Sequence, residues 1–117
     1  MTTQCTTCGD VRQTGDAAMN FPKEFFPCVY VIECEGLYKI GRARILQQRL
    51  RSIRNSRRAP IELVHTIYSW DYDKVECSLH RIFTAQRVSG EWFNLSPQDL
   101  NQLMSMSEGE ILSAGAK

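Results

Sequence analysis

Two apolar segments separated by a turn signal constrain the fold of this chain more than any other feature. Residues 25–34 (FFPCVYVIEC) are rich in β-branched and aromatic side chains, which favour strands, and residues 37–41 (LYKIG) form a shorter segment of the same kind. Glu35-Gly36 lies between them, and glycine adopts the positive φ angles that tight hairpin turns need. We therefore predict a β-hairpin.

The residues after this hairpin change to helical spacing. Between 43 and 55 the apolar side chains recur at intervals of three or four, which predicts an amphipathic helix with arginines on its other faces. Ala59-Pro60 ends this helix, because a residue before proline avoids helical backbone angles. Residues 61–70 (IELVHTIYSW) then predict a third strand.

Two further helices are expected toward the C-terminus. Asp71 is the predicted N-cap of the first, and Ser96-Pro97 has the cap-then-proline signature of the second. Between them, Ser89-Gly90 is a break before a short apolar piece. The side chains that we assign to the core in this half of the chain are Val75, Leu79, Phe83, Trp92 and Phe93.

The order of these elements is typical of an α+β fold, because strands both precede and separate the helices. We predict a small domain with the N-terminal hairpin in a three-stranded, mostly antiparallel sheet and with helices packed on it. The chain has 117 residues, 43% of them apolar and 23% charged, which is typical of one globular domain. The expected parts are a polar N-terminal arm over 1–25, the domain over 26–106 and a frayed C-terminal tail over 107–117.

The sequence lacks membrane and secretion signals. No apolar run approaches the ~20 residues of a membrane span, and the N-terminal residues lack the basic and apolar regions of a secretory signal. We therefore expect a cytoplasmic protein with reduced thiols and no membrane partner.

The five cysteines predict neither a disulfide framework nor a complete metal site. Their number is odd, and most lack framework spacing. Cys5-x-x-Cys8-Gly looks like half of a zinc site, but structural zinc needs four ligands and no second pair with matching spacing follows. Zinc is therefore disfavoured.

The positive charge is concentrated in one segment. The net charge is only +1, yet residues 42–58 contain seven arginines and no acidic residue. Such a concentration is typical of a surface that binds phosphates, although a solvated helix face gives the same pattern. The seven are Arg42, Arg44, Arg49, Arg51, Arg54, Arg57 and Arg58.

Four features outside the core carry side chains suited to chemistry. Three of them are Tyr30 with Lys39 on the paired strand, Arg49 near the apolar side of the basic helix, and the pair Glu76 and His80, listed in the order of the chain. The fourth is the segment 91–94 (EWFN), whose glutamate is either a second metal ligand or a loop residue paired with an arginine. Singly, each has an ordinary explanation, since aromatic residues favour strands and residues four apart on a helix often pair at the surface.

The order and spacing of these residues resemble the GIY-YIG superfamily of nuclease-like domains. Cys28-Val29-Tyr30 stands where that family has Gly-Ile-Tyr, and Lys39-Ile40-Gly41 where it has Tyr-Ile-Gly. Arg49-Leu50 matches the family's catalytic arginine, and Glu76 opens the Glu-x-x-Leu pattern of its metal-binding glutamate. The succession YKIG, RL, ExxLH and GEWF looks most like a branch known from a phage reading frame and a fungal meiotically up-regulated gene product, whose phage members are described as DNA-binding domains.

The resemblance implies a site that acts on one phosphodiester. It assigns Glu76 to a divalent ion, Mg²⁺ or Mn²⁺, and Arg49 to the phosphate. A carboxylate is a hard oxygen ligand and a guanidinium binds phosphate in two places, so the residue types suit these roles. Tyr30 would align or deprotonate the attacking water if nearby cations lowered its pKa, and His80 is the alternative base or an orienting group.

One position departs from the family pattern and leaves two functions open. Lys39 replaces the second family tyrosine, and Tyr38 should point to the opposite face of the strand. The chain is either a metal-dependent DNA endonuclease or a non-catalytic DNA-binding module that uses the arginines of residues 42–58, with Lys39 contacting phosphate as a point charge. Because phosphate contacts do not read sequence, specificity would require a partner protein, self-association or the N-terminal arm.

Overall fold

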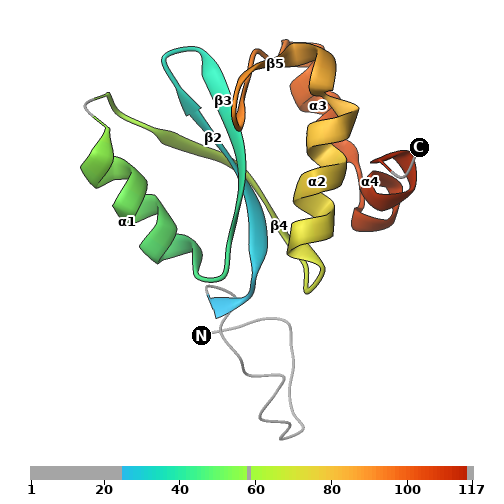
Figure 1. Cartoon of the computed structure of the whole chain (residues 1–117), viewed down its shortest axis with the longest axis horizontal. Coiled ribbons are helices and arrows are strands. Elements are labelled where there is room, and N and C mark those ends of the chain that lie inside the picture. Colours follow the sequence, from blue (N-terminus) through green and yellow to red (C-terminus); the bar gives the residue numbers. More distant parts are fainter. Residues whose placement is uncertain (1–24, 58, 116–117) are drawn as a thin grey trace, which may run out of the picture.

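The computed structural model describes residues 25–57 and 59–115 of the chain (Figure 1). No helix in this part is long and apolar enough to cross a membrane. The elements follow the order β2 (Cys28–Cys34), β3 (Leu37–Ala43), α1 (Leu46–Ser56), β4 (Glu62–Tyr68), α2 (Tyr72–Ile82), the short 3-10 helix η3 (Thr84–Gln86), β5 (Arg87–Ser89), β6 (Trp92–Phe93), α3 (Pro97–Ser105) and α4 (Glu108–Gly115).

The described strands form one antiparallel sheet in the order β4-β2-β3-β6-β5. The α+β fold and the hairpin are confirmed, but the prediction of three strands was wrong because β6 extends the sheet from β3 and β5 extends it from β6. These two strands have only two and three residues, so pairing with distant residues defines them. The hairpin turn has φ angles of 55° at Glu35 and 84° at Gly36, as a type I′ turn requires.

The central strand β2 is buried on both faces and separates two layers of core. Tyr30 packs with Leu46 and Leu50 of α1, whereas Val29 packs with Val75 of α2. Figure 1 shows the same arrangement, with α1 on one side of the sheet and α2, α3 and α4 on the other. Residues next to each other on β2 therefore face different helices, and the site described below begins at this strand.

The predicted helix starts have different capping. Ser96 begins α3 as expected: its Oγ accepts a hydrogen bond from the Asp99 backbone N–H at 3.0 Å, and Asp99 Oδ2 accepts one from the Ser96 N–H at 3.0 Å. Asp71 occupies the N-cap position of α2, but its side chain makes no capping hydrogen bond. Instead, the Asp71 backbone N–H donates to Ser69 Oγ at 3.0 Å, which ties the loop before α2 together.

Helix α4 occupies most of the segment for which the sequence predicted a frayed tail. Its start has reciprocal bonds, since the Ser107 N–H donates to Glu110 Oε1 at 2.8 Å and the Glu110 N–H donates to Ser107 Oγ at 3.2 Å. Ile111 is fully buried in the same core cluster as Val75. The segment is a helix because this apolar side chain has a place in the core.

Close contacts attach α4 to α2 and to the loop after β4. A Cβ placed on Gly115 would be 2.6 Å from the Cα of Ser78, so the two helices approach closely where this glycine lies. Arg81 Nη1 donates to the carbonyl of Gly115 at 3.0 Å. Ser69 Oγ donates to Glu108 Oε2 at 2.6 Å, which links α4 to the loop that leads into α2.

Candidate functional site

The site is built around the contact between Tyr30 and Gly41, which lie opposite each other on β2 and β3. Tyr30 is 1% exposed. A Cβ on Gly41 would lie 2.6 Å from the Tyr30 hydroxyl oxygen and 2.7 Å from its Cζ. The tyrosine ring therefore occupies the space that any other side chain at position 41 would need, and its hydroxyl lies against the backbone of β3.

Burial controls the protonation of Tyr30. Loss of hydration raises the pKa of Tyr30 to about 12, and although Arg49 lowers this pKa, Glu91 and Glu76 raise it further. The role of Tyr30 as a base required nearby cations to lower its pKa. They do not, because loss of hydration raises the pKa of Tyr30 more than Arg49 lowers it. At neutral pH the hydroxyl keeps its proton and can form hydrogen bonds, but it does not act as a base.

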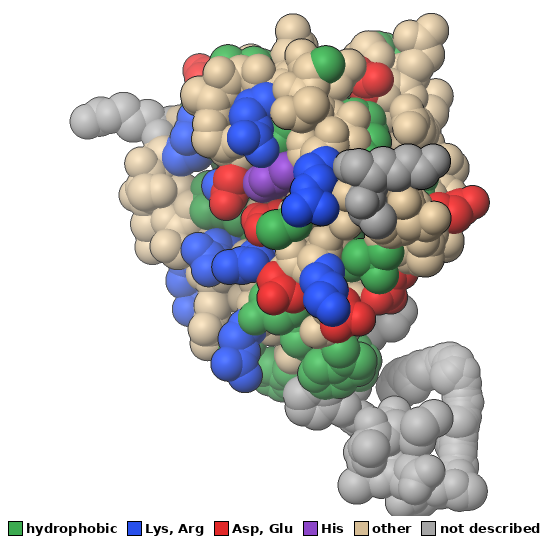
Figure 2. Space-filling model, turned by 45° about the vertical axis from the view of Figure 1, so that its right-hand side comes forward, with side chains coloured by type: hydrophobic (Ala, Val, Ile, Leu, Met, Phe, Trp, Pro, Cys, Tyr) green, Lys and Arg blue, Asp and Glu red, His purple; other side chains and the backbone are tan. Residues whose placement is uncertain are grey.

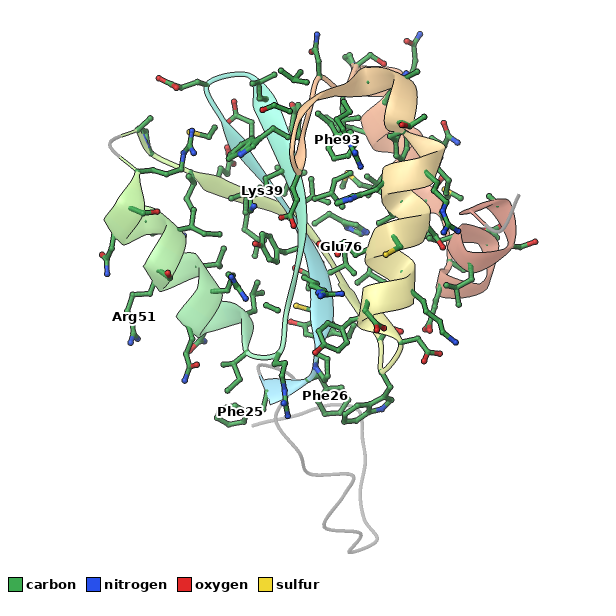
Figure 3. The ribbon with its side chains drawn as sticks, in the orientation of Figure 1. Phe25, Phe26, Lys39, Arg51, Glu76 and Phe93 are labelled. Atoms are coloured by element: carbon green, nitrogen blue, oxygen red, sulfur yellow. The ribbon has the colours of Figure 1, made fainter. Side chains whose placement is uncertain are left out.

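Glu76 on α2 is a buried carboxylate with one unpaired oxygen. Its side chain is 9% exposed, and Oε1 lies 3.8 Å from Arg42 Nη1, while Oε2 has no hydrogen-bond partner among the described residues. Burial raises the pKa of Glu76 and Glu91 adds to the rise, whereas His80, Arg42 and Lys39 act in the opposite direction. Figure 3 shows Glu76 extending from α2 toward β3. Buried polar atoms normally have partners, so this oxygen is a candidate contact for a ligand.

His80 lies on the same edge of α2 as Glu76, as the spacing predicted, but the backbone of β3 fixes it. Its Nε2 is 2.8 Å from the carbonyl oxygen of Ile40, and its ring centroid lies 5.2 Å from that of Phe93. Because a carbonyl can only accept, Nε2 carries the proton, and Nδ1 of the neutral ring is left as an acceptor. The ring is therefore held in one tautomer beside the carboxylate.

Lys39 is paired with Glu91. Its Nζ donates to Glu91 Oε1 at 2.7 Å and lies 5.9 Å from the centroid of the Trp92 ring, on which Arg57 also stacks with its Cζ at 4.6 Å. The sequence alternative paired Glu91 with an arginine, but its partner is Lys39. The two meet because Lys39 lies opposite Trp92 in the sheet, and Glu91 is the residue before Trp92. Tyr38 packs in the core on the α2 side, which confirms that it faces away from Lys39.

Among the described residues, the arginines predicted to bind DNA do not share one face: Arg42 lies on β3 beside Glu76, and the others lie on α1 or next to its ends. Arg44 and Arg49 line an open hollow at the start of the helix, whereas Arg51 points away from the sheet (Figure 3). Arg58 lies outside the described residues. The others of this group are exposed: Arg42, Arg44, Arg49, Arg51, Arg54 and Arg57.

The fold therefore brings most of the predicted site residues within electrostatic range of one another. Arg49 and Glu76 both act on Tyr30, and His80 and Lys39 both act on Glu76. Figure 2 shows acidic and basic side chains gathered around a histidine on one face of the molecule. Sequence reasoning did not place Arg42 beside the carboxylate of Glu76, and it left the role of Glu91 open. Both contacts join β3 to residues far away in the sequence, so no local pattern reports them.

A single carboxylate ligand is compatible with this geometry. No group of three or more His, Cys, Asp or Glu side chains in the described part of the chain is arranged to hold a metal ion. The unpaired Oε2 of Glu76 fits one ligand of a Mg²⁺ or Mn²⁺ ion that keeps most of its water.

The zinc alternative gains no support from the described cysteines. Cys5 and Cys8 lie outside the described residues. Cys28 is buried in the core, and burial raises its pKa to about 11, which disfavours the thiolate that zinc requires.

The arginine-rich helix α1 therefore lies on one side of the sheet, and α2, with the buried Glu76 and the half-buried His80, lies on the other. The chain belongs to the T5orf172 domain family, whose model matches residues 27–107. No curated protein and no solved structure matches the chain. Membership of this family points to a nucleic acid as the partner.

Proposed function

We propose that the chain is a metal-dependent DNA endonuclease of GIY-YIG type that hydrolyses phosphodiester bonds. The observation that carries this proposal is the buried carboxylate of Glu76, whose Oε2 has no partner among the described residues. A buried acceptor without a hydrogen bond costs a fold about 1–3 kcal/mol. This cost has a functional explanation if the oxygen binds a divalent ion next to Tyr30, Arg42 and His80.

Arg49 is the residue proposed to bring the phosphate to this site. It is exposed on α1, yet close enough to Tyr30 to influence its pKa, so a phosphate on its guanidinium lies near the tyrosine hydroxyl. That hydroxyl keeps its proton and is buried against the backbone of β3, so in this proposal Arg49 contacts the phosphate and Tyr30 supports the site from behind.

His80 and Glu76 complete the proposed chemistry. With Nε2 bound to the Ile40 carbonyl, Nδ1 of His80 accepts the proton of the attacking water. Glu76 would hold the Mg²⁺ or Mn²⁺ ion, which supplies positive charge for the phosphoryl and leaving oxygens.

One observation favours a second function, DNA binding without cleavage. Lys39 replaces the second tyrosine of the GIY-YIG pattern, and its ammonium group is already bound to Glu91 at 2.7 Å. A cation paired with an acid adds little charge to a phosphate, and Tyr30 with a pKa of about 12 offers no phenolate. In this alternative the arginines around α1 bind the DNA backbone, and Glu76 has no role in the reaction.

A plasmid-nicking assay with Mg²⁺ or Mn²⁺ separates the two functions. The test variant is Glu76→Gln, which keeps the size of the side chain, and the matched control is Glu62→Gln at an exposed position of β4. Nicking by the wild type and the control, lost in Glu76→Gln with DNA binding retained, supports the endonuclease. Binding without nicking in any metal supports the binding module.

A substitution of Arg49 tests whether the proposed function includes DNA binding through this residue. We expect Arg49→Ala to weaken DNA binding and to reduce its dependence on salt, because one phosphate contact and its released counterion are lost. Lys74→Ala removes the same charge from an exposed position on α2 and is the control. Equal weakening in both variants would show that only net charge matters, and no binding by the wild type would refute both functions.

A further inference from the structure

An open hollow lies at the start of α1, and of its lining residues the proposed reaction uses only Arg49. It has a volume of about 800 Å³ and lies between the beginning of β2, the loop before α1 and the loop after β4. Pro27 and Ile45 form part of its apolar lining, and Trp70 forms another part. Small-molecule sites enclose roughly 300–1,000 Å³, so a group the size of a nucleotide fits this space.

Trp70 provides an aromatic surface in this hollow. Its side chain is 71% exposed, the largest exposure among the large hydrophobic residues that the structure describes as exposed. The ring of Phe26 lies against it at a centroid distance of 5.3 Å and an angle of 37°, which supports the indole from one side. Figure 3 shows Phe26 at the start of β2. An indole held in place and open to solvent is suited to stacking with a planar ligand.

The charged residues of the hollow select an anionic ligand. Arg44 and Arg49 are the charged side chains that line it among the described residues, and neither is matched there by an acidic side chain. The hollow thus combines one aromatic plane with two guanidinium groups, the combination that proteins use for single-stranded nucleic acids.

We propose that this hollow binds an unpaired base of a DNA strand, which stacks on Trp70 while Arg44 and Arg49 hold the neighbouring phosphates. The inference rests on the proposed DNA binding and specifies its ligand. Arg49 lies at both places, since it lines the hollow and acts on Tyr30. A strand with a base in the hollow therefore has its adjacent phosphate on Arg49, on the side of the sheet where Tyr30 packs against α1. A base inside a duplex is already stacked and paired, so the hollow favours single-stranded or locally opened DNA.

The test compares two strands with the same phosphates. One is a short single-stranded oligodeoxynucleotide, and the other has the same length but abasic sites in its centre; both are titrated in EDTA so that no cleavage occurs. We expect the full-length wild-type chain to bind the normal strand about 5- to 150-fold more tightly, since stacking of one base on an aromatic side chain has this effect. Trp70→Ala should remove the difference, whereas Trp70→Phe should retain most of it. Val88→Ala, at another exposed apolar position, is the control.

Fluorescence gives a second readout that does not depend on affinity. The chain has two tryptophans, so Trp92→Phe leaves Trp70 as the only indole. Stacking of a base should quench its emission, and the abasic strand should not. Folding of each variant is checked by its thermal unfolding.

The outcomes separate this inference from the proposed function. If the wild type binds normal and abasic strands equally and Trp70 is not quenched, the inference is wrong and DNA binding through phosphates stands. That result would also leave the hollow to another occupant, either residues 1–24 or a second copy of the chain. If neither strand nor duplex DNA binds, the proposed function fails.

Discussion

The contact between Tyr30 and Gly41 makes a specific prediction about stability. In Gly41→Ala the new Cβ would lie 2.6 Å from the tyrosine hydroxyl, against 3.4–4 Å for an ordinary contact. The ring is 1% exposed between β2 and α1, so it cannot move aside without displacing Leu46 or Leu50. Overpacking of a core costs about 1–3 kcal/mol and replacing a strand glycine by alanine returns about 0.5–1 kcal/mol, so we expect a net loss of about 1–2 kcal/mol.

The assay is a double-mutant cycle measured by chemical denaturation. Tyr30→Leu removes the three ring and hydroxyl atoms that the new Cβ would meet, at the cost of a cavity of its own. In that background Gly41→Ala should become neutral or stabilise the domain by up to about 1 kcal/mol, because only the backbone effect of glycine remains. The wild-type background should instead lose about 5–15 °C in Tm.

Gly109→Ala is the control for this cycle. A Cβ at this position of α4 meets nothing within 4 Å, so the substitution should stabilise the helix by about 0.5–1 kcal/mol. If Gly41→Ala is equally destabilising with tyrosine and with leucine at position 30, the contact is not the cause and the reasoning is refuted.

Three further predictions concern α4 and the buried carboxylate. Gly115→Leu should separate α4 from Ser78, and faster amide hydrogen exchange confined to α4 and its contacts would show it; unchanged exchange would contradict the close approach. Ile111→Ala should lower the free energy of unfolding by about 2–5 kcal/mol, because the side chain is fully buried; a loss below that range in urea titration would mean that α4 is peripheral. Burial raises the pKa of Glu76 in the fold, so the stability contributed by its neutral form is present below the ordinary value of 4.5 and is lost as the pH rises through the raised value. Glu76→Gln should therefore gain Tm relative to the wild type between acid and neutral pH, and a difference that is constant with pH would contradict this.

Local patterns in the sequence were sufficient for the elements that carry the site. Apolar segments rich in β-branched and aromatic residues and the Glu35-Gly36 turn predicted the hairpin, and helical spacing predicted both α1 and α2. The spacing of Glu76 and His80 also placed the two side chains on one edge of α2. Each of these depends on residues a few positions apart, which is the range over which sequence patterns carry structural information.

Pairing between distant residues could not be predicted in the same way. β6 has two residues and is defined by its hydrogen bonds to β3, and the ion pair between Lys39 and Glu91 joins residues 52 positions apart. The raised pKa of Tyr30 likewise follows from burial by α1, which no local pattern reports. These interactions bear on whether the proposed site would cleave DNA or only bind it.

Helix α4 had a signal that was not used. Ser107 and Glu110 form the S-x-x-E capping pattern, and the structure contains both of its hydrogen bonds. The segment has eight residues, and isolated helices this short are not stable. Burial of Ile111 supplies the stability that the segment lacks by itself.

The position of α4 has a consequence for how this family is divided into fragments. The match to the family model ends at residue 107, just before α4 begins at Glu108. Yet α4 fills part of the core with Ile111, and its Glu108 holds Ser69 in the loop that carries Trp70. The part of this chain that the family model matches is therefore shorter than the part that packs into one core. A fragment trimmed to the matched residues would lack Ile111 in the core beside α2 and the Glu108 contact to Ser69, and its inactivity would say nothing about the intact protein.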